Sequence, residues 1–234
     1  TGEIVACKIV PCGISDEELA GVTKEIELLA RCMHPNIVTF RRCHRWRGIL
    51  WVVMECCAGG SVDRFFPALH QPLPEHLIAY ICHEVLVGLN FLHERKVLHR
   101  DIKGSNILLT ESGGVKIADF GVSASVLNTL SRRNSSVGTL HWMSPEAILE
   151  KAYDARTDVW SLGITIIEMA EGQPPNFHFQ QMRAMFEIPK QPPPELKDKA
   201  AWTPQLHRFL ARCVVKDHTR RARAADLLND DFIR

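Results

Sequence analysis

Apolar residues near the start of the chain alternate as they do in strands. Residues 2–11, 37–43 and 49–55 predict three strands, and the basic turn Arg45-Trp46-Arg47-Gly48 joins the last two. Between the first two, residues 15–29 carry apolar side chains at helical spacing and begin with a capping box of Ser and Glu. The first part of the chain therefore predicts a small sheet and one helix.

The rest of the chain follows a helical period. Residues 74–95 predict a long amphipathic helix, whose apolar stripe is Leu77, Ile78, Ile81, Val85, Leu89 and Leu92. An apolar helix follows Asp158 and runs through Met169, and residues 206–215 and 222–233 predict two closing helices. No internal repeat or low-complexity linker interrupts this part. It therefore predicts a mainly helical unit with a substantial core.

A hairpin in the middle of the chain carries polar chemistry at both ends. Residues 106–109 and 115–118 are apolar and flank Ser112-Gly113-Gly114, which is a turn signal. Before the hairpin stand Asp101, Lys103 and Asn106, and after it stands Asp119. Two carboxylates, an amide oxygen and an ammonium can hold Mg²⁺ and position a hydroxyl for phosphoryl transfer. The alternative is a chance hairpin with charged ends.

Composition narrows the class of protein. The chain has 234 residues, 46% hydrophobic and 24% charged, which fits one large domain or two small lobes. The net charge of +1 gives no global footprint for nucleic acid or an acidic membrane, and no run approaches the roughly 18 apolar residues of a membrane span. Residues 1–10 do not resemble a signal peptide. We expect neither nucleic acid as a partner nor a membrane span.

Eight cysteines are scattered without a Cys-x-x-Cys pair. We interpret them as free thiols rather than a zinc site, which favours a reducing, intracellular and cytoplasmic location.

The central stretch resembles a known family. His99-Arg100-Asp101-Ile102-Lys103 to Asn106, followed by Asp119-Phe120-Gly121, is similar to the catalytic loop and metal-binding triplet of eukaryotic protein kinases. The resemblance implies that Asp101 accepts the proton of the substrate hydroxyl, and that Asn106 and Asp119 hold Mg²⁺, with Mn²⁺ as an alternative. Lys103 resembles the serine/threonine type and would neutralise charge on the γ-phosphate.

The same resemblance implies an ATP site. Val5-Ala6-Cys7-Lys8 is similar to the strand whose lysine binds the α- and β-phosphates, and Glu25 would pair with Lys8. Without the resemblance, the strand pattern makes Lys8 an edge or snorkelling lysine, and Glu25 is a solvated charge. Glu17, Glu18 and Glu27 are less well placed alternatives for the glutamate that pairs with Lys8. The resemblance also implies that Ala6, Leu108 and Met54 contribute to the ATP site, with Met54 as the gatekeeper. Glu55 and Cys57 would form the hinge and bind the edge of the adenine through their backbones.

Residues 119–146 resemble the activation segment. Ser135, or alternatively Ser136, falls at the activating phosphosite, and its phosphate would pair with Arg100. Thr139 would bridge Asp101 and Lys103. Farther on, Asp158 would hold the catalytic-loop backbone, and Glu146 would pair with Arg221. Residues 138–146 depart from the family pattern at three positions, which changes the expected peptide preference but not the reaction class.

The resemblance covers the whole chain and is most detailed for the sterile-twenty-like group. Residues 121–124, 160–165, 168–172 and 182–189 match germinal-centre and mammalian-sterile-like kinases, and the kinase domain of class III myosins is a near alternative. Kinases place a Gly-x-Gly-x-x-Gly hairpin before the lysine strand, and this sequence begins at that strand. Either an excerpt or a natural short form would account for this.

The expected fold is therefore α+β, a two-lobed protein-kinase fold. Residues 1–57 would form a small β-rich N-lobe lacking its first two strands, and residues 58–234 a mainly helical C-lobe. The expected function is an ATP-dependent protein serine/threonine kinase in a signalling cascade, acting on protein Ser/Thr and activated by an upstream kinase or by self-phosphorylation. The main alternative is a non-catalytic kinase-like scaffold, and a metabolite kinase is weaker.

Overall fold

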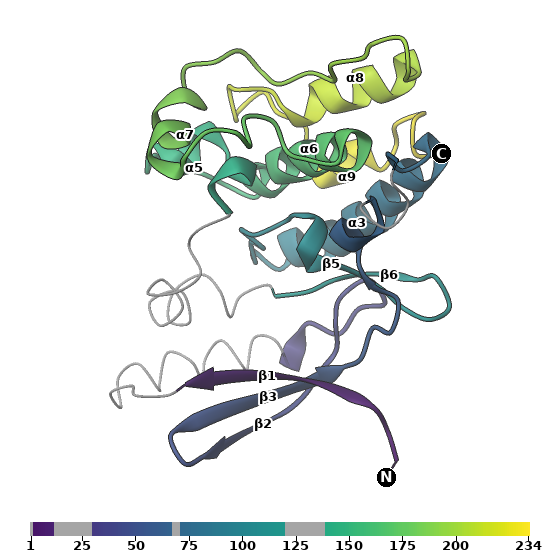
Figure 1. Ribbon diagram of the computed structural model, residues 1–234, viewed down its shortest axis with the longest axis vertical. Coiled ribbons are helices and arrows are strands. Elements are labelled where there is room, and N and C mark those ends of the chain that lie inside the picture. The colour runs from purple at the N-terminus through teal and green to yellow at the C-terminus, as the bar shows by residue number, and fades with distance from the viewer. Residues whose placement is uncertain (1, 12–29, 67–70, 120–138) are drawn as a thin grey trace.

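The structure is a computed structural model that describes residues 2–11, 30–66, 71–119 and 139–234 (Figure 1). Two three-stranded sheets and a set of helices make up this part of the chain. One sheet lies at one end of the molecule, and most helices gather at the other end (Figure 1). This arrangement confirms the predicted α+β class.

The first sheet consists of β1 (Val5–Pro11), β2 (Phe40–Trp46) and β3 (Ile49–Glu55), antiparallel in the order β1-β3-β2. The prediction for β3 is confirmed, but the predicted strand 37–43 is wrong at both ends. Ile37 forms only an isolated bridge to Ile117, and β2 extends to Trp46. The turn needs only Arg47 and Gly48, both with positive φ (49° and 70°), because such two-residue turns match the twist of a hairpin.

The faces of this sheet follow from its register. Ala6 pairs with Met54 and Lys8 pairs with Val52, so these four residues share one face. Ala6 and Lys8 are half-buried, whereas Val5, Cys7 and Ile9 on the other face are exposed. The sheet therefore turns Lys8 toward the rest of the protein.

The second sheet is antiparallel and joins β4 (Gly60–Ser61), β5 (Ile107–Leu109) and β6 (Val115–Ile117) in that order. Residues 36–38 dock onto it: Val38 N–H donates to Ile117 O (3.0 Å), and Ile117 N–H donates to Asn36 O (2.8 Å). The Asn36 side chain donates to Glu84 (2.6 Å). This segment ties the first sheet to the helical part, and the domain boundary at residue 57 stays a prediction.

Two long helices build the core. The predicted helix 74–95 is confirmed as α3 (Glu75–Glu94), although Leu77 is 40% exposed and was wrongly assigned to the buried stripe. The helix after Asp158 is α6 (Arg156–Glu171), which ends at Gly172 with a positive φ of 78°. Residues 157–170 of α6 are all buried. Because α6 is buried all round, other elements pack on every side of it.

Shorter elements complete the described fold. The short 3₁₀ helices are η1 (Val62–Arg64), η2 (Gly104–Asn106) and η3 (Thr139–Trp142). The remaining α-helices are α5 (Pro145–Ile148), α7 (Gln181–Glu187), α8 (Pro204–Cys213) and α9 (Ala224–Leu227). The predicted helix 222–233 is thus much too long. Asn229, Asp230 and Asp231 follow α9, and these residue types favour turns over helix interiors.

No helix in the described ranges has the length and apolar character that a membrane span requires. The seven cysteines within these ranges are not joined in disulfides.

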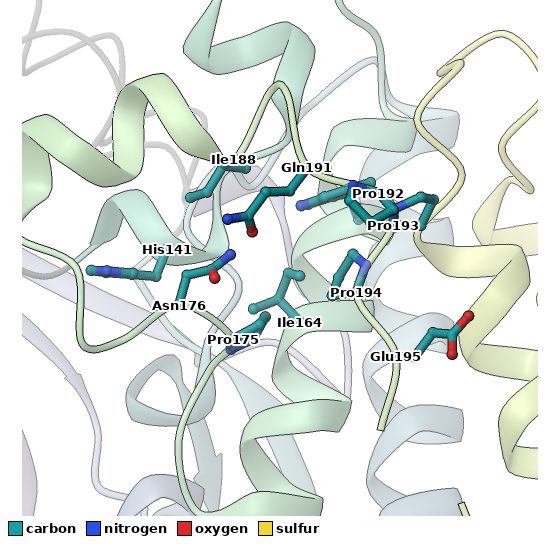
Figure 2. A pocket seen from close by; sticks show the side chains of 11 residues that line it. His141, Ile164, Pro175, Asn176, Ile188, Gln191, Pro192, Pro193, Pro194 and Glu195 are labelled. Atoms are coloured by element: carbon teal, nitrogen blue, oxygen red, sulfur yellow. The ribbon is translucent and has the colours of Figure 1, made fainter. Parts of the chain in front are cut away.

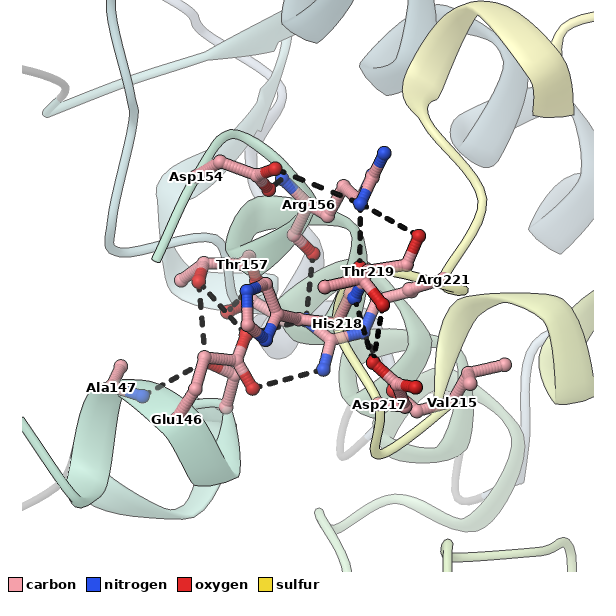
Figure 3. Close-up of polar contacts among 12 residues, drawn as sticks. Glu146, Ala147, Asp154, Arg156, Thr157, Val215, Asp217, His218, Thr219 and Arg221 are labelled. Carbon is pink, nitrogen blue, oxygen red and sulfur yellow. Dashed lines mark hydrogen bonds and ion pairs between the residues drawn. The ribbon is translucent and has the colours of Figure 1, made fainter. Parts of the chain in front are cut away.

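A buried ion pair joins α5 to the C-terminal segment (Figure 3). Arg221 donates to both carboxylate oxygens of Glu146, at 2.6 and 3.0 Å, and also to the backbone carbonyls of Val215 and Arg156. Burial raises the pKa of Glu146, but Arg221 outweighs it and holds that pKa below its usual value. The predicted pairing is confirmed, and its geometry is bidentate.

We expect Arg221→Met to lower the free energy of unfolding by about 3–5 kcal/mol, because it leaves the Glu146 carboxylate buried and unpaired. Urea denaturation measures this change. Glu146→Gln combined with Arg221→Met should recover part of the loss, since no buried charge then remains. A single variant as stable as the parent would show that the pair does not hold these segments together.

Candidate active site

The carboxylate of Asp158, at the start of α6, holds the backbone that precedes Asp101. Asp158 is fully buried and accepts the N–H groups of His99 (2.9 Å) and Arg100 (2.7 Å). It also bonds to Nε2 of His93 on α3 (2.8 Å). Burial raises the pKa of Asp158, but the hydrogen bond and charge of His93 outweigh it, so the pKa lies below its usual value. The predicted contact between Asp158 and this loop is present.

The loop needs this support because its conformation is unusual. Arg100 has a positive φ of 69°, which non-glycine residues rarely adopt. His99 is fully buried beside it, with Nε2 donating to Ala118 O (2.9 Å) and Nδ1 accepting from Asp101 N–H (3.2 Å). Burial lowers the pKa of His99, which agrees with a neutral ring that donates from one nitrogen and accepts at the other. The imidazole thus connects Asp101 to the end of β6.

Asp101, Lys103 and Asn106 lie together as the sequence predicted. Asp101 Oδ2 accepts from Asn106 Nδ2 (2.8 Å) and pairs with Lys103 Nζ (3.0 Å). Asn106 Nδ2 also donates to the Asp101 carbonyl (2.8 Å). Asp101 Oδ1 is buried and has no hydrogen-bond partner among the described residues. Within the described part of the chain, Oδ2 is therefore anchored and Oδ1 has no donor.

Asp119 lies next to this group and faces the first sheet. Ala118 N–H donates to Asn106 O (2.8 Å), which fixes the spacing between Asn106 and Asp119. Asp119 has a positive φ of 61°, and its Oδ1 pairs with Nζ of Lys8 on β1 (2.9 Å). The structure therefore brings Lys8 to the same place as Asp101, Asn106 and Asp119.

The donor atoms at this place fit Mg²⁺. Both side-chain bonds of Asn106 use Nδ2, which leaves its Oδ1 without a donor in the described part of the chain, close to the carboxylate residue Asp119. Mg²⁺ prefers hard oxygen ligands and commonly uses one or two protein groups together with phosphates and waters. Among the described residues, no group of three or more His, Cys, Asp or Glu side chains could hold a metal ion.

The predicted adenine-binding residues lie on the two sheets. Met54 and Ala6 are cross-strand partners in the first sheet, and Leu108 lies on β5 in the second. Glu55 ends β3, where its side chain pairs with Lys116 of β6 (2.9 Å) and accepts from Thr39 N–H (2.8 Å). Cys57 O accepts from Gly60 N–H (3.1 Å). The Glu55–Lys116 pair, which sequence reasoning missed, thus fixes the segment between the sheets.

Several predicted site residues fall outside the described residues. These are Glu25, Ser135, Ser136 and the side chain of Thr139, so the Lys8–Glu25 pair and the phosphosite stay predictions. Arg100, the expected phosphate partner, is exposed, and its guanidinium lies 5.9 Å from the centre of the Tyr153 ring.

Comparison with known proteins decides the family. The protein kinase domain profile matches residues 1–233. This chain belongs to the protein kinase family. It is 50% identical over 233 residues to serine/threonine-protein kinase dst1 of Dictyostelium discoideum, covering 99% of this chain and 31% of that protein.

Two further relatives agree with this assignment. Serine/threonine-protein kinase 1 of Arabidopsis thaliana is 46% identical over 233 residues, covering all of this chain and 28% of that protein. Myosin-IIIa of Homo sapiens is 44% identical over 246 residues, covering 99% of this chain and 15% of that protein. The chain therefore spans less than a third of the length of each of these relatives. Two of them are named as serine/threonine-protein kinases and one as a class III myosin, in agreement with the resemblance to these proteins.

Glu168 of α6 binds the backbone of the loop that contains Asp101 and Lys103, and sequence reasoning gave Glu168 no role. Its Oε2 accepts from Gly104 N–H (2.9 Å) and from Trp142 Nε1 (2.9 Å). A Cβ at Gly104 would lie 3.0 Å from this carboxylate, so glycine permits the close approach. Burial raises the pKa of Glu168 to about 7, although both donors act to lower it. The sequence did contain one signal for this role, because Glu168 is an acidic residue within an otherwise apolar helix.

A cavity of about 200 Å³ lies away from the predicted nucleotide-binding residues (Figure 2). Pro192, Pro193 and Pro194 lie on one side of it and His141 on the opposite side, with Ile164 of α6 between them. Nε2 of His141 contacts Phe179 O (3.3 Å), and Nδ1 is buried without a partner among the described residues. The lining contains no residue that we assigned to ATP or Mg²⁺.

The raised pKa of Glu168 predicts a pH dependence of stability. Between about pH 4.5 and 7, Glu168 keeps its proton in the folded kinase domain but loses it in the unfolded chain. The contribution of Glu168 to the free energy of unfolding therefore falls as the pH rises through this range. The total loss is about 3 kcal/mol. Glu168→Gln removes this contribution. We expect the stability of the variant relative to the parent to rise by about 2–3 kcal/mol between pH 5 and pH 8.

Urea denaturation at several pH values measures the difference, and the exposed Glu111→Gln is the matched control. Parallel pH profiles for Glu168→Gln and the parent would contradict the assignment.

Proposed function

We propose that this chain transfers the γ-phosphoryl group of ATP to serine or threonine hydroxyls of protein substrates. The observation that carries the proposal is the grouping of Asp101, Lys103 and Asn106 next to the Lys8–Asp119 pair. Phosphoryl transfer requires positioning and charge neutralisation more than covalent chemistry. The grouping supplies a base, two cations and oxygen ligands on a supported backbone.

Asp101 is proposed as the base. Its Oδ2 is anchored by Asn106 and Lys103, so Oδ1 is left to accept the proton of a substrate hydroxyl. The hydroxyl oxygen then bonds to the γ-phosphorus while the bond to the β,γ-bridging oxygen breaks, and ADP leaves. Lys103, on the same carboxylate, neutralises charge that develops on the transferred group. The support for this role is the Oδ1 atom of Asp101, which has no hydrogen-bond partner among the described residues.

Asn106 and Asp119 are proposed to hold Mg²⁺, which neutralises phosphate charge when it is bound. Lys8 is proposed to bind the α- and β-phosphates, and the ammonium then shares or leaves its present partner, Asp119. Ala6, Met54 and Leu108 are proposed to contact the adenine, with the Glu55 carbonyl and the Cys57 backbone at its edge. The half-buried positions of Ala6 and Lys8 on the face of the sheet shared with Met54 support these roles.

Regulation by phosphorylation of Ser135 or Ser136 is part of the proposal. A phosphate there brings about −1.5 to −2 charge at neutral pH and would pair with the exposed Arg100. Since Arg100 directly precedes Asp101, this pairing would order the segment beside the base. An upstream kinase or self-phosphorylation would supply the group.

Asp101→Asn tests the base. We expect phosphoryl transfer from ATP and Mg²⁺ to a generic basic protein to fall about 10²–10⁴-fold, the usual contribution of general base catalysis. Nucleotide binding should persist because Asp101 is not among the proposed nucleotide ligands. Radiolabel transfer and calorimetric titration with ATP and Mg²⁺ measure the two quantities.

Asp231→Asn, at an exposed residue far along the chain, is the matched control and should transfer phosphate like the parent. Equal rates for Asp101→Asn and the parent would rule out the assigned base. Nucleotide binding without transfer in the parent would favour the non-catalytic scaffold instead.

Lys8→Met tests the phosphate contact. We expect weaker ATP binding and at least tenfold slower transfer, because the variant removes the cation and leaves the larger helical part intact. The exposed Lys190→Met is the control. Unchanged affinity and rate would show that Lys8 is a structural partner of Asp119 and nothing more.

A further inference from the structure

The β2–β3 hairpin concentrates positive charge on a protein whose net charge is only +1. Arg41, Arg42, Arg45 and Arg47 are all exposed on β2 and its turn. Trp46 lies among them and is 57% exposed. Ile9, on the same face of the sheet, is 54% exposed, so Trp46 is not a single apolar side chain among the arginines. The charge and the aromatic ring therefore mark a local surface with its own chemistry.

The register places this surface on the outer face of the first sheet. Trp46 pairs with Ile49 and His44 pairs with Trp51, while Ile9 of β1 is the other cross-strand partner of Trp51. This face is opposite to the one that carries Lys8 and Met54. We define the hairpin patch as Ile9, Arg42, His44, Trp46 and Arg47; the exposed Arg45 lies on the opposite face of the strand and is not part of it. The patch is thus separate from the proposed ATP site.

Most of the positive charge on the patch has no acidic partner among the described residues. Arg41, just outside it, pairs with Glu3 (2.9 Å), but no carboxylate in the described ranges pairs with Arg42, Arg45 or Arg47. The guanidinium of Arg47 lies 4.3 Å from the centre of the Trp46 ring, so a cation covers one side of the indole. Ile9 adds an apolar side chain that is 54% exposed. The patch combines exposed apolar side chains with several positively charged side chains.

The shape of the region favours a flat partner. The β2–β3 turn lies at an outer edge of the molecule, on the far side of the first sheet from most helices (Figure 1). A protruding hairpin end meets a flat surface without needing a matching groove. Tryptophan prefers the interface between water and lipid, and arginine extends its charge toward headgroups while its stem stays apolar.

We propose that the hairpin patch docks this chain on membranes rich in anionic lipids, with Trp46 entering the headgroup region and the arginines binding lipid phosphates and carboxylates. The contact is peripheral and reversible, since few apolar groups take part. It leaves the Lys8 face of the sheet uncovered. Docking would therefore raise the local concentration of the proposed kinase at a membrane surface without closing its nucleotide site.

Vesicle cosedimentation tests the proposal. The 234-residue chain is mixed with vesicles of phosphatidylcholine alone or with 30% phosphatidylserine at low ionic strength. We expect binding to the anionic vesicles only. Each basic residue near such a surface contributes about 1 kcal/mol, or about fivefold in partitioning, so Arg42→Glu combined with Arg47→Glu should reduce binding at least about 25-fold.

Lys151→Glu combined with Arg208→Glu makes the same change in net charge at exposed residues elsewhere and should bind nearly as well as the parent. Trp46→Ala keeps the charge but should weaken binding several-fold. It should also abolish the quenching of tryptophan fluorescence by lipids with brominated acyl chains. Circular dichroism checks that each variant is folded.

Five results would overturn the proposal. The first two are binding of the chain to neither kind of vesicle and equal binding to both kinds. The third is an equal loss of binding in the hairpin and control variants, and the fourth is a Trp46→Ala variant that binds and is quenched like the parent. The fifth is saturable binding of single-stranded RNA that depends on Arg42 and Arg47 while vesicles do not bind, which would assign the patch to nucleic acid. None of these results bears on phosphoryl transfer, so the proposed function is tested separately.

Discussion

The buried carboxylate of Asp158 is the interaction on which the rest of the site depends. A fully buried anion is costly unless every oxygen finds donors, and Asp158 finds two backbone N–H groups and His93. These bonds hold Arg100 in a left-handed conformation that the chain would otherwise avoid. Asp101 is the next residue, so the conformation of that backbone sets the position of its side chain.

Two further links extend this support. Glu168, on the same helix as Asp158, accepts from Gly104 and from Trp142, so α6 holds the loop at both ends of the group that includes Asp101. On the other side, Lys8 reaches Asp119 from the first sheet. Only the second link, between Lys8 and Asp119, depends on the first sheet. The core therefore positions the proposed base, whereas the relative placement of the two sheets positions the proposed phosphate ligand.

Short-range patterns predicted much of this architecture. The apolar stripe of α3 and the continuous apolar run of β3 are each almost enough to predict their element. The types and spacing of residues 99–106 were enough to show the resemblance to a kinase catalytic loop. The end of β2 could not be predicted as easily, because the turn is decided by positive φ at Arg47 and Gly48 rather than by the surrounding basic residues. The failure at α9 has a similar cause: apolar residues at helical spacing continue to Phe232, but Asn229 and Asp230 end the helix.

Long-range polar contacts were harder to predict from the sequence. The Glu55–Lys116 pair and the contacts of Glu168 join residues 61 and up to 64 positions apart, and nothing local marks the partners. Asp158 and the Glu146–Arg221 pair were anticipated only through the family resemblance. Periodicity thus predicts which face is buried, while the polar partners inside depend on the assembled fold.

The most direct test of this account is the rate of phosphoryl transfer by Asp158→Asn at saturating ATP and Mg²⁺. Among the described residues, Asp158 hydrogen-bonds to His93 and to the backbone of His99 and Arg100 and to none of the proposed nucleotide ligands, so we expect its effect to pass through that backbone. We predict at least a 100-fold lower maximal rate in a folded variant that still binds nucleotide. A folded variant with the rate of the parent would contradict the claim that this carboxylate sets the geometry of the site.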